Sequence, residues 1–161
     1  MNDYTVLTIL NELGECVFWY RYSYEEQANG LRLGKKIAEH LSKFKDIQCL
    51  VETNFDPSIF DIIYSNVSND VILYGKHQGD EYKNKIISSL NASMQKGLIR
   101  LPFDLSVVES ELVSYEIVKL GKYPVYSAPS GMHDDCVISL ALANNLMCNY
   151  EGYNYQQFDI N

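Results

Sequence analysis

The spacing of apolar residues changes several times along this chain, and that change decides which fold class the chain can adopt. Short runs rich in β-branched and aromatic residues, which are typical of strands, lie at residues 4–10, 16–22, 47–51 and 71–75. Helices are predicted, mostly from apolar residues at steps of three and four, over 23–44, 57–64, 80–96, 105–112 and 133–148. Two leading strands followed by alternating helices and strands predict an α/β fold with a mixed sheet flanked by helices.

Local signals place the ends of several elements. A turn containing glycine at 11–15 joins the first two runs into a hairpin. Ser23, with Glu26 three residues later, has the form of a capping box and begins the helix predicted over 23–44. Gly97 is predicted to end the helix over 80–96. Residues 115–128 predict a strand pair that turns at Gly121-Lys122.

Length and composition bound the class of protein. A chain of 161 residues fits one domain, which we expect over 1–148, followed by a flexible C-terminal tail over 149–161 that is rich in Tyr, Asn and Gln. A hydrophobic share of 47% with 21% charged residues excludes disordered, collagen-like and coiled-coil classes. No apolar run approaches the ~18 residues of a membrane span, and the first residues do not have the pattern of a secretion signal.

The four cysteines indicate a reducing compartment. Cys16, Cys49, Cys136 and Cys148 show no CxxC spacing, and three of them lie among apolar residues. Cysteines of this kind are typical of reduced core residues in a cytosolic protein. The spacing therefore also argues against a structural zinc site.

The net charge of −8 restricts how the chain can meet nucleic acid. The 21 acidic residues outnumber the 13 basic ones, whereas a sequence-independent grip on phosphates needs clustered Lys and Arg. The charge does not exclude a nuclease, because carboxylates that hold divalent cations are themselves negative and the bound ions reverse the local sign.

Acidic residues stand at the ends of three predicted elements. Glu52 follows an apolar strand, Asp134 and Asp135 open the last helix, and Asp3 precedes the first strand. Taken singly, an acid after a strand is usually a solvated loop residue and an Asp at a helix start is usually a cap. Periodicity and spacing alone leave a soluble α/β domain with carboxylates that could hold Mg²⁺.

Several motifs, in order along nearly the whole chain, resemble the nuclease domain of phage terminase large subunits. Residues 131–143 match that family's closing pattern "G-x-HDD-x-V-x-(A/S)-L-x-L-A", and Glu52-Thr53-Asn54 resembles its "E-x-N-x-x-G" segment. Asp3 opens a stretch that matches its "D-Y-T-V" strand. Further similarities are Lys83 or Lys85 before Ile86, the "G-x-I-x-L-P" at 97–102, and the "E-L" at Glu111-Leu112.

The resemblance implies an RNase H-like fold and a nuclease that cuts concatemeric double-stranded DNA with two divalent cations, Mg²⁺ or Mn²⁺. Glu52, Asp134 and Asp135 would be the metal ligands, with Asp3 as an auxiliary catalytic acid. Adjacent helix residues point about 100° apart, so one of the two aspartates would bind a metal directly while the other caps, orients or serves the second ion. Lys85 and His133 would contact the DNA phosphate, although a solvated lysine and a helix-entry histidine stay open as alternatives.

One departure from the family pattern matters for chemistry and for the sheet. Family members have a further central strand before "D-Y-T-V", with an Asp that bridges both metals, and we expect that strand and Asp to be missing here. The sheet would then expose strand edges that invite pairing with another chain, including a homo-oligomer. We also expect the ATPase portion of the family, with its Walker motif, to be missing, and Asp56-Pro57 stands near the family's Gly after "E-x-N".

These departures leave more than one functional hypothesis. The first is a terminase endonuclease domain, weak or inactive by itself, that works with an ATPase portion, the small terminase subunit and the portal in the cytoplasm of a phage or prophage host. The second is a catalytically silent prophage remnant or oligomerising module with the same fold. The third is another RNase H-like nuclease, such as a junction resolvase, which the HDD and L-P context disfavours.

Overall fold

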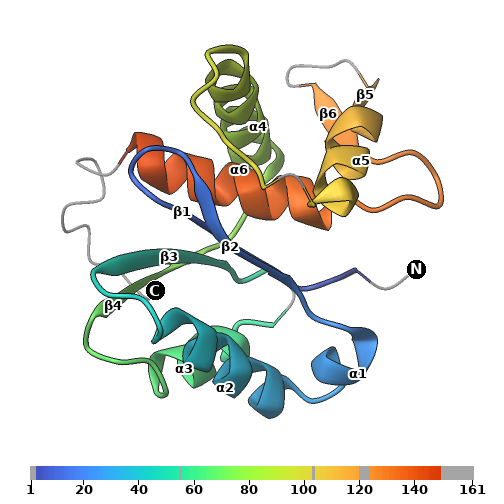
Figure 1. The fold of residues 1–161 in the computed structure, drawn as a ribbon. Coiled ribbons are helices and arrows are strands. Elements are labelled where there is room, and N and C mark those ends of the chain that lie inside the picture. Colours follow the sequence, from blue (N-terminus) through green and yellow to red (C-terminus); the bar gives the residue numbers. More distant parts are fainter. Residues whose placement is uncertain (1–2, 55, 103, 120–123, 150–161) are drawn as a thin grey trace.

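Short strands lie between two layers of helices in the computed structural model, which describes residues 3–54, 56–102, 104–119 and 124–149 (Figure 1). The strands are β1 (Val6–Leu10), β2 (Cys16–Arg21), β3 (Ile47–Glu52), β4 (Val71–Lys76), β5 (Glu116–Lys119) and β6 (Val125–Ser127). The helices are α1 (Tyr24–Gln27), α2 (Gly30–Leu41), α3 (Ser58–Tyr64), α4 (Asp80–Gln95), α5 (Ser106–Ser114) and α6 (Asp135–Cys148). The order confirms the predicted α/β class.

The strands form three separate pairs. β1 and β2 are antiparallel, with Val6 opposite Arg21 and a register shift between Ile9 and Leu10. β3 and β4 are parallel, with Ile47 opposite Val71. The antiparallel pair β5–β6 lies apart from them. Since β1 is not hydrogen-bonded to β3, the main sheet is divided into two halves.

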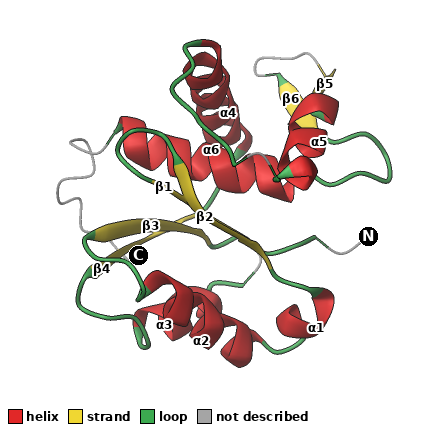
Figure 2. Cartoon of the chain, viewed as in Figure 1, coloured by secondary structure: helices red, strands yellow, loops and turns green. Residues whose placement is uncertain are grey.

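Each half of the divided sheet is covered on both faces. α2 and α3 lie on one side, whereas α6 and α4 lie on the other (Figure 2). One cluster of buried apolar residues lies on the α2–α3 side and includes Leu7, Ile9, Ile37, Ile47 and Ile63. The second lies against α6 and includes Leu50, Ile86, Leu90, Val108 and Leu140. Leu7 and Ile9 of β1 belong to the first cluster, whereas Val6 and Leu10 pack against the second. Side chains of a strand alternate between its two faces in this way.

The structure corrects two helix boundaries. The helix predicted over 23–44 is two helices, because the Ser23–Glu26 capping box builds only α1 and Asn29 begins α2 by accepting a hydrogen bond from the Arg32 N–H. The helix predicted from 133 begins at Asp135. Gly97 has a φ of +67°, which confirms it as a helix terminator. The predicted turn at 121–122 and the tail beyond Asn149 lie outside the described residues.

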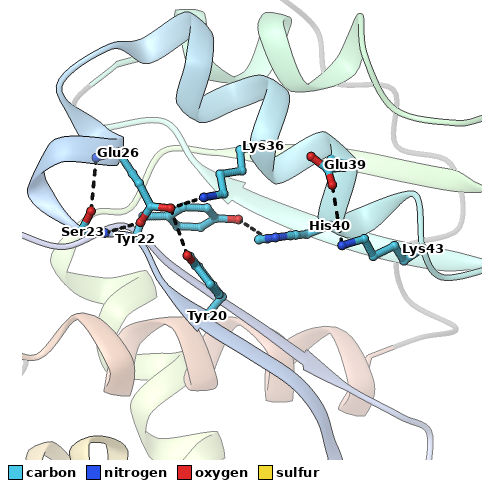
Figure 3. A network of polar contacts seen from close by, with 8 residues as sticks. All are labelled: Tyr20, Tyr22, Ser23, Glu26, Lys36, Glu39, His40 and Lys43. Carbon is cyan, nitrogen blue, oxygen red and sulfur yellow. Dashed lines mark hydrogen bonds and ion pairs between the residues drawn. The ribbon is translucent and has the colours of Figure 1, made fainter.

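A polar network fastens α1 and α2 to β2 (Figure 3). Glu26 accepts hydrogen bonds from the Tyr20 hydroxyl at 3.0 Å and from the Lys36 ammonium. The Lys36 contact is the main reason why the pKa of Glu26 is lowered to about 2. Behind this pair, the fully buried Tyr22 hydroxyl lies 2.9 Å from Nδ1 of His40. Burial lowers the pKa of His40, so a neutral imidazole completes the network.

Neither a membrane-spanning helix nor a disulfide occurs among the described residues. None of the helices they form has the length and apolarity needed to cross a membrane. All four cysteines are free thiols, with Cys16 and Cys136 buried and Cys148 exposed.

Close contact between α2 and α3 depends on Gly34. A Cβ atom at Gly34 would lie 2.5 Å from Cγ2 of Ile62 and 3.3 Å from Cδ1 of Ile59. Gly30, in the same helix, has only Asp56 Oδ2 at 3.7 Å from the corresponding position. The two glycines of one helix therefore differ in what a methyl group would meet.

We expect Gly34→Ala to lower the free energy of unfolding by about 1–3 kcal/mol, because overpacking at Ile62 outweighs the gain in helix propensity. Gly30→Ala is the matched control and should leave the free energy unchanged or raise it by up to about 1 kcal/mol. Urea unfolding followed by circular dichroism measures both. Equal effects of the two substitutions would contradict the close packing.

Candidate active site

Acidic side chains from three distant segments meet at one end of the divided sheet. β3 ends in Glu52, α6 begins with Asp135, and Asp3 lies just before β1. One ligand atom each from Asp3, His133 and Asp135 lies within 4.8 Å of the others. Asp3, Glu52 and Asp135 also line one end of a cavity of about 1230 Å³. The structure thus brings together acids that are up to 132 positions apart in the sequence.

Asp135 has the most contacts in this group. Its Oδ2 accepts a hydrogen bond from the backbone N–H of Tyr4 at 2.9 Å and lies 3.4 Å from Nδ1 of His133. Burial raises the pKa of Asp135, and the carboxylates of Asp3 and Asp134 raise it further, against the lowering effect of the Tyr4 N–H. The charged form of Asp135 is therefore held in an unfavourable environment that a cation would relieve.

Glu52 belongs to the same electrostatic group. Burial is the main cause of its raised pKa, and Asp134, Asp135 and Asp3 add to the rise. Lys83 opposes them, because its positive charge favours the ionised carboxylate. Glu52 is not within the close cluster of Asp3, His133 and Asp135, so it faces that cluster rather than completing it.

Asp134 does not cap α6 with its side chain, which corrects the expectation for an acid at a helix start. It occupies the N-cap position without a capping hydrogen bond, and its Oδ2 lies 3.3 Å from the Lys83 ammonium. Glu111 of α5 caps the helix instead, because its Oε2 accepts a hydrogen bond of 2.7 Å from the Cys136 N–H. The Asp134 side chain is therefore directed to Lys83.

Lys83 is the lysine that the structure brings to the carboxylates. Lys85, two residues later on α4, is exposed. Residues two apart on a helix point in widely different directions, so only one of the two can face the site. The sequence pattern allowed either lysine.

Glu111 is the residue that spacing arguments missed. It is buried, and its second oxygen, Oε1, has no hydrogen-bond partner among the described residues. A carboxylate at a helix N-terminus is favoured by the helix dipole and by the free N–H groups. The available signal was the "E-L" pair of the resemblance, which carried no role by itself.

Aromatic rings hold the Tyr4 backbone beside Asp135. The Tyr4 ring stacks on Tyr24 with centroids 4.5 Å apart, and the Arg21 guanidinium lies 4.4 Å from its centre. His133 meets the same ring edge-on at 4.9 Å. These contacts orient both His133 and the N–H that binds Asp135.

Asn54 ties together the loops that follow β3 and β4. Its Nδ2 donates to the Gln78 carbonyl at 2.9 Å, and its Oδ1 accepts from the Gln78 N–H at 2.6 Å. These two hydrogen bonds between the loops fix the backbone just beyond Glu52. The asparagine of the "E-x-N" pattern therefore has a structural role in this chain.

The residues of this end of the sheet fit a divalent cation. Carboxylate oxygens are the preferred ligands of Mg²⁺ and Mn²⁺, and imidazole suits transition metals. The mutual spacing of Asp3, His133 and Asp135 is close to what one ion with bonds of about 2.1 Å requires. Raised carboxyl pKa values supply the reason for binding, since a cation removes the repulsion.

We expect Glu52→Gln to stabilise the protein at pH 7 in the absence of divalent metal, by about 0.5–2 kcal/mol. Because the pKa of Glu52 is raised by folding, its ionised form destabilises the native state above that pKa. The gain should fade as the pH falls through this raised pKa and vanish below the unfolded value of about 4.3. Unfolding in urea at pH 7 and pH 4 measures it.

Glu39→Gln is the control, because the Glu39 side chain is 69% exposed and its ion-pair partner among the described residues is Lys43, just after the end of α2. That substitution should change the free energy of unfolding by less than about 0.5 kcal/mol at either pH. Destabilisation by Glu52→Gln at pH 7 would contradict the electrostatic description of the site.

Comparison with solved structures identifies the fold. The chain superposes on a crystal structure of the large terminase nuclease from thermophilic phage G20c with a TM-score of 0.77 and 21% identity, over 90% of this chain and 76% of that one. The cobalt-bound form of that nuclease matches with a TM-score of 0.69 and 18% identity, over 89% and 80% of the two chains. The magnesium-bound form gives 0.75 and 21%, over 89% and 74%.

Sequence comparisons add nothing to this match. No protein-family model and no curated protein matches the chain. The likeness therefore rests on the arrangement of strands and helices. This chain has the RNase H-like fold of a phage large-terminase nuclease domain.

Proposed function

We propose that this chain is a divalent-metal-dependent DNA endonuclease domain of a viral genome-packaging terminase, which cuts concatemeric DNA. The observation that carries the proposal is the meeting of Asp3, Glu52, Asp134 and Asp135 at one end of the sheet, where burial and mutual repulsion raise the pKa values of Glu52 and Asp135. The fold of the G20c nuclease supports the same chemistry.

In this proposal Asp135, Asp3 and His133 hold one cation, and Glu52 and Asp134 serve a second. The cation is Mg²⁺ or Mn²⁺, and the G20c nuclease has been crystallised with magnesium and with cobalt. Bound metal ions would activate the attacking water and stabilise the leaving oxygen of the phosphodiester. Tyr4, through its N–H, orients Asp135, and Lys83 orients Asp134.

Bound metal would offset the negative charge that opposes the approach of DNA to this site. The chain carries a net charge of −8, and the four carboxylates would repel phosphate. Bound divalent cations would reverse the local sign. Lys83 would then supply positive charge beside the phosphate, and the ring nitrogen of His133 that does not hold metal would donate a hydrogen bond. An ATPase portion, a small terminase subunit and the portal are the partners that the resemblance proposes, in the bacterial cytoplasm.

One observation favours a second function, that of a catalytically silent module with the same fold. The large cavity separates the β1 end, with Asp3, from the β3 end, with Glu52. In the family that the chain resembles, an Asp that bridges both metals belongs to this region. We therefore expect low activity from this chain alone.

The test is nicking of supercoiled plasmid in Mn²⁺, with Mg²⁺ and chelator controls. We expect Glu52→Gln and Asp135→Asn to lower the nicking rate at least ~100-fold, since removal of a ligand exceeds the 10–100-fold loss typical of groups that only support one. Glu39→Gln should cut at the wild-type rate. Calorimetric titration with Mn²⁺ separates metal binding from cleavage.

Metal-dependent nicking that both site variants abolish would establish the endonuclease. A folded chain that binds Mn²⁺ without nicking would support the silent module. Nicking that survives in both variants would contradict this assignment of the site, and an unchanged rate in chelator would contradict metal dependence.

A lysine pair tests the substrate contact. We expect Lys83→Met to slow nicking about ten-fold or more, because it removes the positive charge that lies 3.3 Å from Asp134. Lys85→Met, on the exposed side of the same helix, should leave the rate within about two-fold. The reverse ranking would assign the phosphate contact to Lys85.

A further inference from the structure

A smaller cavity, of about 380 Å³, lies beside the candidate metal cluster. Its walls come from three segments that are far apart in the sequence. Arg21 is the last residue of β2, Ser106 and Ser110 belong to α5, and Met132 and His133 precede α6. His133 is also a member of the close cluster of metal-ligating side chains. The two places therefore share a wall, and we call this cavity the α5 pocket.

Arg21 brings a positive charge to the α5 pocket. Side chains two residues apart on a strand lie on the same face, and Trp19 of β2 packs against the apolar cluster on the α6 side. Arg21 therefore extends toward α5 and α6. Its guanidinium lies 4.4 Å from the centre of the Tyr4 ring. Stacking on a ring leaves the N–H donors at the edge of a guanidinium available for hydrogen bonds.

No acid of the described residues neutralises Arg21, although Glu111 lines the same pocket. Glu111 accepts a hydrogen bond from the Cys136 N–H through Oε2, while its Oε1 is buried without a partner in the described part of the chain. Its charge is thus directed to the N-terminus of α6, where the helix dipole offsets it. The guanidinium of Arg21 has neither an ion pair nor a hydrogen bond within the described ranges, so its charge is left for a ligand.

Two serine hydroxyls of α5 add neutral hydrogen-bond donors. Ser106 and Ser110 are four residues apart and lie on one face of the helix. Both are exposed, and neither hydroxyl has a partner among the residues that the structure describes. By contrast, the hydroxyl of Ser114, one turn further on, already donates to the Glu111 carbonyl at 3.2 Å. The first two turns of α5 therefore offer two unused donors.

The size and the rim of the α5 pocket restrict what can enter it. A volume of about 380 Å³ is at the lower end of the ~300–1,000 Å³ of ligand sites, which suits one nucleotide unit and excludes a folded partner. Met132, which is 51% exposed, and Val107 add apolar surface. Arginine and serine are side chains that proteins use to hold the phosphates of DNA. An apolar rim suits the deoxyribose next to such a phosphate.

We propose that the α5 pocket binds a backbone phosphate of DNA, next to the phosphate that would be cleaved on the same strand. The identity of this ligand rests on the proposed nuclease function. Arg21 would hold the phosphate through two guanidinium N–H groups, Ser106 and Ser110 would donate to it from α5, and the sugar would pack on Met132. The pocket would thereby fix the position of the DNA strand over the carboxylates.

The Tyr4 ring explains why the two phosphates would be neighbours. Arg21 lies over this ring, and His133 meets it edge-on with centroids 4.9 Å apart. The backbone N–H of Tyr4 in turn binds Asp135. One residue thus positions the guanidinium of the α5 pocket, the imidazole between the two places and a carboxylate of the metal cluster. A strand held at the carboxylates would continue along α5.

Binding of a short fluorescein-labelled DNA duplex tests the pocket without any need for cleavage. Fluorescence anisotropy is measured in Ca²⁺, which binds carboxylate oxygens and so offsets their charge. We expect Arg21→Gln to weaken binding at least about ten-fold, because it removes charge-assisted hydrogen bonds. The slope of log Kd against log salt concentration should fall by about 0.9, which corresponds to one lost phosphate contact.

Two further variants control for charge and for geometry. Arg32→Gln is the matched control, because Arg32 is exposed on α2, in the other layer of helices (Figure 2). It should change neither the affinity nor the slope. Arg21→Lys keeps the charge without the planar fork, so it should retain the wild-type slope and bind more weakly than wild type. Equal effects of Arg21→Gln and Arg32→Gln would overturn the proposal.

Neutral methylphosphonate linkages, placed one at a time along one strand, identify the phosphate. At one position the linkage should weaken binding by the wild type about as much as Arg21→Gln does. The same linkage should cost the Arg21→Gln variant nothing further, since that contact is already lost. Losses that add at every position would overturn the contact. Urea unfolding checks that Arg21→Gln is folded, and the same scan with Arg21→Lys gives an independent reading.

Two comparisons distinguish the ligand and the function. Displacement of the duplex by inorganic phosphate, where chloride of equal ionic strength has no effect, would assign the pocket to a free anion and overturn the proposal. Plasmid nicking by the wild type, with equal DNA binding by Arg21→Gln, would support the nuclease and overturn the pocket. Binding through Arg21 without nicking would support the pocket and not the nuclease. Failure of the wild type to bind the duplex would overturn the pocket.

Discussion

The packing of α6 against both halves of the divided sheet is the constraint on which the rest of the structure depends. β1 and β3 share no hydrogen bonds, so helices must hold the halves together. Ser139 of α6 bonds Thr8 at 2.8 Å and the Val6 carbonyl at 3.1 Å, while Leu140 and Ala141 share a cluster with Leu50 of β3. A helix that is buried around most of its circumference must be apolar on nearly every face. The run Val137–Leu142 meets that requirement.

The same helix carries the candidate chemistry at its first turn. Its N-terminal N–H groups need acceptors, and Glu111 supplies one by bonding Cys136. Asp134 and Asp135 are then left to face Lys83 and Tyr4, respectively. Burial and neighbouring carboxylates raise the pKa values of Asp135 and Glu52. The ionised forms of these two side chains are therefore disfavoured in the folded protein. Such a site is poorly suited to stability and well suited to a divalent cation.

A cavity separates two of the carboxylates of the candidate site. Asp3 approaches from β1 and Glu52 from β3, on opposite sides of this cavity. Because β1 and β3 share no hydrogen bonds, the spacing of these carboxylates depends on how α6 packs against both strands.

The sequence by itself determined the class of elements and most of their bounds. Runs of β-branched and aromatic residues on either side of a turn that contains glycine specified the hairpin of β1 and β2, and short apolar runs specified β3 and β4. The prediction of one helix over 23–44 was wrong, because the apolar residues at helical spacing, such as Leu33 and Ile37, all lie after Asn29, and the capping box at Ser23 belongs to α1 alone. Local capping by one side chain outweighed the pattern there.

Some residues of the candidate site could also be predicted from the sequence, whereas others were revealed only by the tertiary structure. Glu52, Asp134 and Asp135 could be selected from their places at element ends and from the HDD resemblance. Only the tertiary structure decided that Lys83 rather than Lys85 faces them, that Glu111 caps α6, and that β1 and β3 border one cavity. Each of these depends on contacts between residues far apart in the chain. Spacing along the sequence reports neighbours within an element, whereas packing between elements fixes which side chains meet.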